Sequence, residues 1–382
     1  MVTNVNNRNR QPKGTNKGGQ FAPETHAATP TDLDTTNSTP PDTVTRYSNG
    51  KPKLEIWRKN KEFHRTDGPA RIEYAPDGKK IVEEWFQNGD IHRTDGPART
   101  IYDKNGDITR EEWYQNGDLH RDNGPAITTR ELDYPTGNTY TTEKWYQHGI
   151  LHRTDGPAYT HYAPDGTIMS KVWLQDGQHH RDDGPAVIEY FGPKGAASKE
   201  KWCQHGKLHR EDGPAVTYYD DNGRATHEKW FQNGKEHRTD GPALISYDED
   251  GSIEYERWSQ HGQLHRDGGP AVTVRHTNGN IGAEEWFQNG KEHREGGPAA
   301  IYRRENGTIE DEQWFQDGKH HRLDGPAHIT YWADGKTRRE TWWSHGKKHR
   351  TDGPARIFYN QNGDIESEEY WKNGEEQQKP AQ

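Results

Sequence analysis

Apolar and polar positions alternate along the chain in a pattern that returns about every 28 residues. In eleven copies the second residue after a Gly-Pro-Ala triplet is β-branched, and in eight of them a Tyr stands two residues further on. This period of two predicts a strand with one buried face. An Asp-Gly or Asn-Gly pair then predicts a tight turn, and Glu-x-Trp, as at Glu83 and Trp85, predicts the return strand. Each copy is therefore expected to form a β-hairpin.

A His-Arg pair fixes the register of these copies. Each pair begins seven residues after a Trp and is followed by Gly-Pro-Ala, and the pairs begin at His64, His92, His120, His152, His180, His209, His237, His265, His293, His321 and His349. Eleven matches at this spacing are typical of a repeat architecture. The distance from Trp to Ala is 13 residues in every copy, whereas insertions fall only between that Ala and the next Trp. The Trp-to-Ala connector is therefore predicted to be the packed joint, and the hairpin tip to accept extra residues.

A second turn is predicted inside the connector, at Asn88-Gly89 and its equivalents. His148, His205, His261 or His345 replaces the Asn in four copies. Among non-glycine residues, Asn, Asp and His tolerate positive φ best, so these four histidines are interpreted as turn residues.

The recurring motif residues are interpreted as structural. A catalytic site needs different groups that converge at one place, and here the same groups recur along an axis. Because the Glu and the Trp share a strand face, we expect a Glu–Arg pair around each Trp. The residues given this structural role, taken from two copies, are Trp85, His92, Arg93, Gly96, Pro97, Ala98, Trp230, His237 and Arg238.

Composition indicates a thin structure. Only 27% of the 382 residues are hydrophobic, yet the chain has 14 Trp and 18 Tyr. That is too few aliphatic residues for one thick core and too many aromatic residues for a disordered polymer. We predict an all-β fold, an elongated array of about eleven 28-residue β-hairpin repeats over residues 48–374, built as a single twisted sheet or a solenoid. Residues 1–47 are predicted to be a disordered polar tail, and residues 375–382 a disordered end.

Charge and hydropathy restrict the partners and the location. The formal net charge is −10, and the first 47 residues carry five basic and four acidic side chains, which leaves −11 on the repeats. An acidic array is a poor partner for nucleic acid. Within the tail, Arg10, Lys13 and Lys17 form a small basic arm, either a solvated leader or a docking peptide. No stretch is apolar enough to span a membrane, and the start lacks the apolar core of a secretory signal, so we expect a cytoplasmic protein.

The residues suggest no catalytic or metal chemistry. Cys203 is the only cysteine, so no disulfide can form within the chain. Motif histidines of neighbouring copies would lie about 9–10 Å apart, two strand spacings, which is too far for a shared zinc ion. No phosphate-binding loop, Ser nucleophile elbow or paired-Cys site occurs. We therefore expect no enzyme, no catalytic residue, no metal site and no cofactor.

Three segments carry a resemblance to a known family. Tyr-Asp-Lys-Asn-Gly at 102–106, Glu-Glu-Trp-Tyr-Gln-Asn-Gly at 111–117 and Asp-Gly-Pro-Ala at 155–158 resemble the variant MORN repeat of bacterial YwqK-type antitoxin proteins. The resemblance covers about residues 54–374 and implies consecutive β-hairpins in an elongated sheet that contacts proteins or membrane surfaces. Residues 10–22 are similar to a leader found on proteins of actinobacteria and their phages.

Three functions remain open at this point, and the third, after the two that follow, is an enzyme of unrecognised type. The first is a repeat scaffold that binds a protein partner, in a phage-associated or antitoxin-like role. The alternative is binding to a glycan or a cell wall, because aromatic rings can stack on sugars. The surplus aromatic residues Trp332, Trp343 and Trp371 support this alternative. The sequence names neither the partner nor the oligomeric state.

Overall fold

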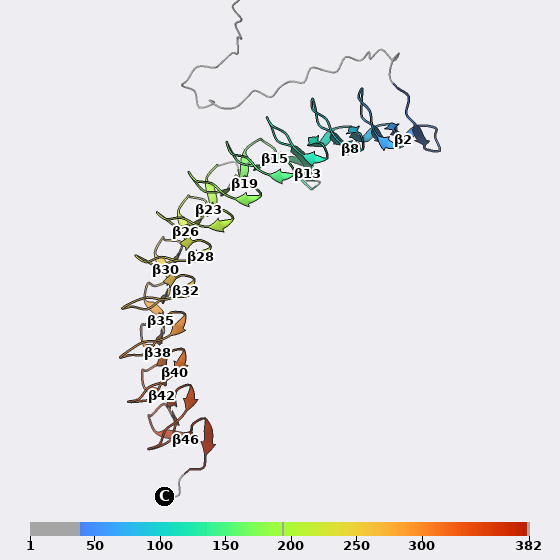
Figure 1. Ribbon diagram of the computed structural model, residues 1–382. Helices are drawn as coiled ribbons and strands as arrows, with labels where there is room; N and C mark the ends of the chain where they lie inside the picture. Colours follow the sequence, from blue (N-terminus) through green and yellow to red (C-terminus); the bar gives the residue numbers. More distant parts are fainter. Residues whose placement is uncertain (1–38, 134, 193–194, 380–382) are drawn as a thin grey trace, which may run out of the picture. The chain divides into compact units, whose positions relative to one another are not determined.

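The computed structural model describes residues 39–379, apart from residues 134 and 193–194. The compact unit that begins at Pro41 contains all of the described strands. Turns and loops join these strands, and the described residues include no α-helix. Figure 1 shows the hairpins following one another in chain order, from blue to red. The predicted all-β repeat fold is confirmed.

Twenty-five strands form one antiparallel main sheet, in which the two strands of a hairpin pair with each other and then with the neighbouring hairpins. Its strands are β1 (Thr43–Arg46), β2 (Pro52–Ile56), β5 (Arg71–Tyr74), β6 (Lys80–Glu84), β9 (Arg99–Tyr102), β10 (Ile108–Glu112), β13 (Ile127–Asp133), β14 (Asn138–Lys144), β17 (Tyr159–Tyr162), β18 (Ile168–Val172), β21 (Val187–Tyr190), β22 (Ala197–Lys201), β25 (Val216–Tyr219), β26 (Ala225–Lys229), β29 (Leu244–Tyr247), β30 (Ile253–Arg257), β33 (Val272–Arg275), β34 (Ile281–Glu285), β37 (Ala300–Arg303), β38 (Ile309–Gln313), β41 (His328–Tyr331), β42 (Thr337–Thr341), β45 (Arg356–Tyr359), β46 (Ile365–Lys372) and β47 (Glu375–Gln377).

Each connector adds a second, shorter hairpin of two-residue strands. These short strands are β3 (Arg58–Lys59), β4 (Glu62–Phe63), β7 (Phe86–Gln87), β8 (Asp90–Ile91), β11 (Tyr114–Gln115), β12 (Asp118–Leu119), β15 (Tyr146–Gln147), β16 (Ile150–Leu151), β19 (Leu174–Gln175), β20 (Gln178–His179), β23 (Cys203–Gln204), β24 (Lys207–Leu208), β27 (Phe231–Gln232), β28 (Lys235–Glu236), β31 (Ser259–Gln260), β32 (Gln263–Leu264), β35 (Phe287–Gln288), β36 (Lys291–Glu292), β39 (Phe315–Gln316), β40 (Lys319–His320), β43 (Trp343–Ser344) and β44 (Lys347–Lys348).

The turn of the short hairpin has the predicted conformation. Its two central residues both have positive φ, for example 51° at Asn88 and 88° at Gly89. The histidines that replace the Asn also have positive φ, with 48° at His148. The interpretation of the four histidines as turn residues is therefore confirmed.

Backbone hydrogen bonds close every connector and explain why its length never varies. The Trp85 amide donates to the Ala98 carbonyl at 2.7 Å, and the His92 amide donates to the Trp85 carbonyl at 3.0 Å. The same two bonds recur in all eleven copies. The Ala at the end of each connector is fully buried, with 0% exposure. One inserted residue would break this closed ring, whereas the long hairpin has a free turn.

Adjacent connectors are also joined to one another. The Arg93 amide donates to the Tyr114 carbonyl of the next repeat at 3.1 Å, and the Gly117 amide donates back to the Ile91 carbonyl at 3.0 Å. These bonds recur along the array, so the short hairpins form a second row beside the main sheet. The connector is the packed joint that the sequence indicated.

The expected domain boundaries need two corrections. Strand β1 lies inside the segment assigned to the tail of residues 1–47, because it pairs with β2 and covers the first edge of the sheet. Strand β47 lies inside residues 375–382, the predicted disordered end, and pairs with β46. Strand β1 precedes the first repeat and is ordered by a strand edge that a sequence pattern does not display, whereas β47 follows the turn Asn373-Gly374 and completes the short hairpin of the partial twelfth copy. Residues 1–38, with Arg10, Lys13 and Lys17, lie outside the described residues.

The natural four-residue insertion lengthens one long hairpin. Strands β13 and β14 have seven residues each, whereas β9 and β10 have four and five. Both longer strands still pair in register, from Ile127 opposite Lys144 to Asp133 opposite Asn138. The insertion therefore extends the hairpin away from the connector.

Among the described residues, no helix has the length and apolar character needed to cross a membrane.

Insertion tolerance should differ between the two hairpins of one repeat. Four residues added between Asp250 and Gly251 should change the free energy of unfolding by less than about 1 kcal/mol, because lengthening an open loop costs little entropy. The same insertion between Trp258 and His265 should cost several times more, because it separates the amide of His265 from the Trp258 carbonyl, 3.1 Å apart. Urea unfolding of both variants measures the difference. Equal losses would contradict the closed connector.

Candidate binding surface

A three-layer stack lies at the centre of every connector. The guanidinium carbon of Arg238 lies 4.1 Å from the centroid of the Trp230 ring. Gly241 packs closely against the same guanidinium, because a Cβ atom added to Gly241 would lie only 2.6 Å from that carbon. Nη1 of Arg238 donates to the Pro242 carbonyl at 3.3 Å, and Nε donates to Asp240 at 2.9 Å. This Arg–Trp stacking recurs in all eleven copies, at 3.6–4.2 Å. The motif residues Trp, Arg, Gly and Pro thus hold the connector together.

The expected Glu–Arg pair around each Trp is wrong. The motif arginine binds the connector itself, and the Glu two residues before the Trp accepts a hydrogen bond from the next long hairpin. In the clearest case the Tyr247 hydroxyl donates to Glu228 at 2.8 Å. Burial and the Glu228 carboxylate raise the pKa of Tyr247 to about 12. Seven copies contain this Tyr–Glu bond, always with 19 residues between the partners.

The other four copies lack the Tyr–Glu bond but have a different attractive contact at the same place. In three copies an Arg replaces the Tyr and pairs with the Glu, as Arg303 does with Glu284 at 2.7 Å. In the fourth copy Lys171 replaces the Glu, and its Nζ lies 6.0 Å from the centroid of the Tyr190 ring. This face of the main sheet, which we call the ladder face, is therefore occupied by contacts within the array.

The motif histidines bind the next repeat through one nitrogen. Nδ1 of His237 accepts the amide of the turn residue His261 at 3.1 Å. The equivalent bond occurs in all eleven copies, at 3.0–3.2 Å. A nitrogen that accepts a hydrogen bond cannot carry a proton, so each bond requires Nδ1 to be unprotonated. The His of the motif is therefore a structural acceptor.

Histidine rings stack wherever the turn residue is itself a histidine. The ring centroids of His237 and His261 are 4.6 Å apart, and those of His321 and His345 are 4.4 Å apart. Burial and, secondarily, the neighbouring histidine lower the pKa of both His237 and His321 below 6.5. The tilted ring contact with the neighbouring histidine thus disfavours protonation of His237 and of His321.

Residues that differ from copy to copy gather on the other face of the main sheet. We define this variable face by the positions one and three residues after each connector Ala and one and three before each Trp. The position before Trp shows the variety: Ile56, Glu84, Glu112, Lys144, Val172, Lys201, Lys229, Arg257, Glu285, Gln313, Thr341 and Glu369. The short hairpins contact this face, since Arg257 pairs with Glu236 through two bonds. Several positions of this face are buried, among them Glu112, Val216 and Thr341 at 2–3% exposure, so contacts exist on both faces, but those of the variable face differ more from copy to copy.

The three candidate aromatic residues do not form one site. Trp332 lies at the turn of a long hairpin, where Arg338 covers its ring at 4.8 Å. Trp343 opens a short hairpin at the far end of β42, roughly 17 Å away at about 3.4 Å per residue for five strand residues. Trp371 occupies the same position in the partial twelfth copy. Trp343 and Trp371 therefore belong to the repeat frame, at a position where six other copies have Phe or Tyr.

Trp343 forms part of a partly buried cluster on the variable face. Its ring stacks on His320 at 5.2 Å, and Phe315 lies 4.0 Å from the same His320 ring. Burial, with a smaller effect of His328, lowers the pKa of His320 to about 4. In the described part of the chain, the buried Nε1 of Trp343 and Nε of Arg339 have no hydrogen-bond partner. Buried donors without a partner are exceptions to the usual pairing of buried polar groups.

Trp371 lines an open hollow of about 520 Å³ at the end of the array. Arg350, Asp352 and Tyr370 share the lining. The Lys348 ammonium lies 3.5 Å from the centroid of the Trp371 ring, and the indole N–H donates to Glu369 at 3.0 Å. One face of this aromatic ring is therefore already covered by a cation.

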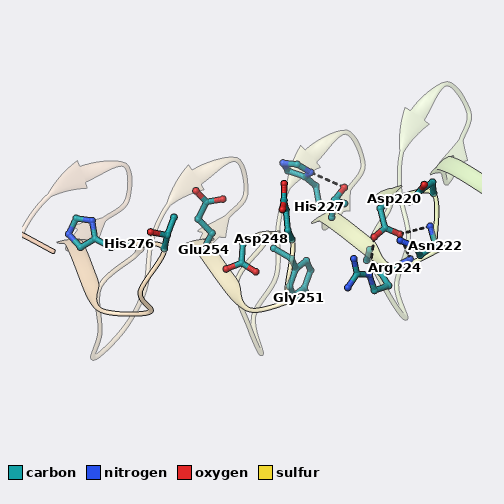
Figure 2. Close-up of a pocket in the computed structure, with 14 residues that line it drawn as sticks. Asp220, Asn222, Arg224, His227, Asp248, Gly251, Glu254 and His276 are labelled. Atoms are coloured by element: carbon teal, nitrogen blue, oxygen red, sulfur yellow. Dashed lines mark hydrogen bonds and ion pairs between the residues drawn. The ribbon is translucent and has the colours of Figure 1, made fainter.

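Figure 2 shows a second hollow, of about 750 Å³, beside the turns of the long hairpins. Asp220 and Asp248 belong to its lining, but each carboxylate is used by its own turn. Asp220 accepts the amide of Arg224 at 2.9 Å, and Asp248 accepts the hydroxyl of Ser252 at 2.7 Å. These bonds lower the pKa of both carboxyl groups. Among the described residues, no three His, Cys, Asp or Glu side chains are placed to hold a metal ion.

Comparisons with known proteins identify no family. No known family profile and no curated protein matches the chain. Solved structures similar to it include those titled "Crystal Structure of TcdB2-TccC3-Cdc42" and "Crystal Structure of TcdB2-TccC3", at 11% and 12% identity and a TM-score of 0.12 each. The matches cover 82% and 84% of this chain, which spans only 18% and 20% of the other chains. Likeness at this level carries no argument about fold or function.

The three-layer stack can be tested by a double-mutant cycle. Gly241→Ala should lower the free energy of unfolding by about 1–3 kcal/mol, since the new methyl group overlaps the Arg238 guanidinium. In an Arg238→Ala background the same substitution should cost much less, because the overlapping group is gone. Equal costs in both backgrounds, measured by urea unfolding, would show that Gly241 is required for another reason.

Stability should fall as the histidines are protonated. The pKa values of His237 and His321 are depressed in the folded state, so the folded protein binds fewer protons than the unfolded chain. Their contribution to the free energy of unfolding is therefore complete above about pH 6.5, and it declines as the pH falls below that value. The melting temperature should drop between about pH 7.5 and about pH 5.5, and less so in His237→Asn/His321→Asn, because Asn Oδ1 accepts the turn amide without titrating. An NMR titration that puts either pKa above 6.5 would contradict this result.

Proposed function

We propose that this protein is a non-enzymatic scaffold that binds a protein partner through the variable face. The observation that supports the proposal is the division between the two faces of the main sheet. The residues that recur are engaged in contacts within the array, whereas charge and size on the variable face change from copy to copy. Repeat proteins recognise partners in this way, because a regular scaffold presents a series of independently variable positions.

The charges of the variable face favour a partner with acidic groups at its centre. Lys201 and Lys229 lie before the Trp in two successive copies, and Nε of Arg339 is a buried donor without a partner in the described part of the chain. Guanidinium groups of this kind bind carboxylates with defined geometry. A phage-associated or antitoxin-like role and a cytoplasmic location belong to the same proposal and rest on the sequence.

A glycan or cell-wall ligand is the second candidate. The hollow that Tyr370 and Trp371 line favours it, because aromatic and polar groups occur there together. Comparable hollows of about 460 Å³ and 580 Å³ lie beside Trp230 and beside Trp314 with Phe315, but their lining consists largely of motif residues that recur, whereas the variable face differs from copy to copy. The protein-binding function is therefore better supported.

Two matched triple variants test the proposal. Lys201→Gln/Lys229→Gln/Arg339→Gln removes three cations from the variable face. Arg130→Gln/Arg275→Gln/Arg303→Gln removes three from the ladder face and serves as the control. We expect a protein captured from a host lysate by the wild type and the control to be lost by the first variant. In calorimetry, the purified partner should bind the first variant at least about tenfold more weakly than it binds the wild type, a difference of about 1.4 kcal/mol.

Three results would contradict the proposal. In the first, both triple variants lose binding equally. In the second, no purified protein binds the wild type. In the third, the protein captures cell-wall polysaccharide and Trp371→Ala abolishes that capture. The last result would establish the glycan function instead. Circular dichroism and the melting temperature of each variant show whether a loss of binding reflects a loss of fold.

A further inference from the structure

The turns of the short hairpins carry a row of exposed side chains that the repeat motif does not explain. The row consists of the residue that follows each turn: Glu62, Asp90, Asp118, Ile150, Gln178, Lys207, Lys235, Gln263, Lys291, Lys319 and Lys347. All eleven are exposed. Each side chain lies over the turn Gly of the next repeat. Lys207, for example, lies over Gly234, and its Cβ would be 3.6 Å from a Cβ added to that glycine. We call this series the turn row.

Charge along the turn row is segregated by sign. The first three positions are acidic, the next two are neutral, and five of the last six are lysines. Glu375 of the partial copy ends the row. Structural need does not explain this order, since acidic, neutral and basic side chains all cover the same Gly.

The charges at the two ends of the row have no partner within the array. In the described part of the chain, no ion pair or hydrogen bond engages the side chain of Glu62, Asp90 or Asp118, nor that of Lys291, Lys319 or Lys347. Most other acidic and basic positions of the repeats are paired, as Arg238 is with Asp240. The turn row therefore presents two unpaired blocks of opposite sign.

The two blocks also have the same period. Steps of 28 residues separate Glu62, Asp90 and Asp118, and the same steps separate Lys291, Lys319 and Lys347. Each step corresponds to two strands, or roughly 9–10 Å along the array. Three acids and three lysines at equal spacing are complementary in an antiparallel arrangement.

We propose that the turn row is a self-association surface on which two copies of this chain lie antiparallel. Glu62 of one copy faces Lys347 of the other, Asp90 faces Lys319, and Asp118 faces Lys291. A two-fold axis relates the two copies, so each pair occurs twice: Glu62 of the first copy meets Lys347 of the second, and Lys347 of the first meets Glu62 of the second. The two-fold axis then passes beside Lys207, and Ile150, Gln178, Lys235 and Gln263 lie between the axis and the charged contacts.

A second copy fits the row better than a free polyanion does. The repeats carry a formal net charge of −11, so a long anionic polymer would be repelled by most of the surface around the lysines. The acidic block of another copy supplies negative charge only where the lysines stand. Exposed ion pairs are weak singly and are screened by salt. The dimer should therefore be reversible and sensitive to ionic strength.

A charge-swap experiment on the full-length protein tests the proposal. The wild type should sediment as a monomer–dimer mixture at low salt and as a monomer at about 1 M salt, where the Debye length is about 3 Å. Lys291→Glu/Lys319→Glu/Lys347→Glu and Glu62→Lys/Asp90→Lys/Asp118→Lys should each weaken self-association at least about tenfold. An equimolar mixture of the two variants should recover a dimer, because every position of the two blocks then faces the opposite charge.

A matched control separates the turn row from net charge. Asp221→Lys/Glu249→Lys/Glu305→Lys changes the net charge by the same amount as the acidic-block variant, but at exposed turns of the long hairpins. This control should dimerise like the wild type. A wild type that is monomeric at every salt concentration, or a variant mixture that does not associate, would overturn the proposal. Binding of polyphosphate that requires the row lysines, by a protein that stays monomeric, would assign the row to polyanions instead.

Discussion

The rest of the structure depends on one arginine held between an indole ring and a glycine. A planar guanidinium can stack on Trp230 and still direct its N–H groups sideways, toward Pro242 and Asp240. A lysine offers neither the flat surface nor the fixed donors. The glycine is needed because any Cβ would overlap the guanidinium. With this stack in place, the connector closes and its Ala becomes fully buried.

Closed connectors make each repeat depend on its immediate neighbours. The backbone bonds and the His Nδ1 bond both run to the next repeat, and no described contact of the motif reaches further. Stability in such an array is approximately a sum over repeats and their interfaces, so a chain with few aliphatic residues can be ordered without a thick core. The ends then need special treatment. Strand β1 covers the first edge of the main sheet, and at the other end β47 pairs with residues 370–372 of β46 in a last short hairpin.

The same architecture separates support from recognition. Tyr–Glu, Arg–Glu and Lys–Tyr contacts replace one another on the ladder face without changing its role. On the variable face the contacts differ from copy to copy, as where Arg257 pairs with Glu236, and on the turn row both charged blocks are unpaired, so charge at these positions can follow a ligand. Binding chemistry in this protein is therefore expected where copies differ, and the conspicuous His-Arg motif marks the scaffold.

The sequence by itself determined the repeat, its register and the connector as the packed joint, because these depend on spacing alone. It also determined the turn histidines, since few residues other than Gly accept positive φ. Tertiary structure decided the partners of the charged side chains. The Glu–Arg expectation failed because Glu228 meets a tyrosine 19 residues later across a strand pair, a contact that no local pattern displays. Strand β1 was missed for the same reason, as a short polar segment becomes a strand only beside an existing edge. The turn row lay in the sequence as unremarkable single residues, and only the stacking of turns showed that their charges form one line.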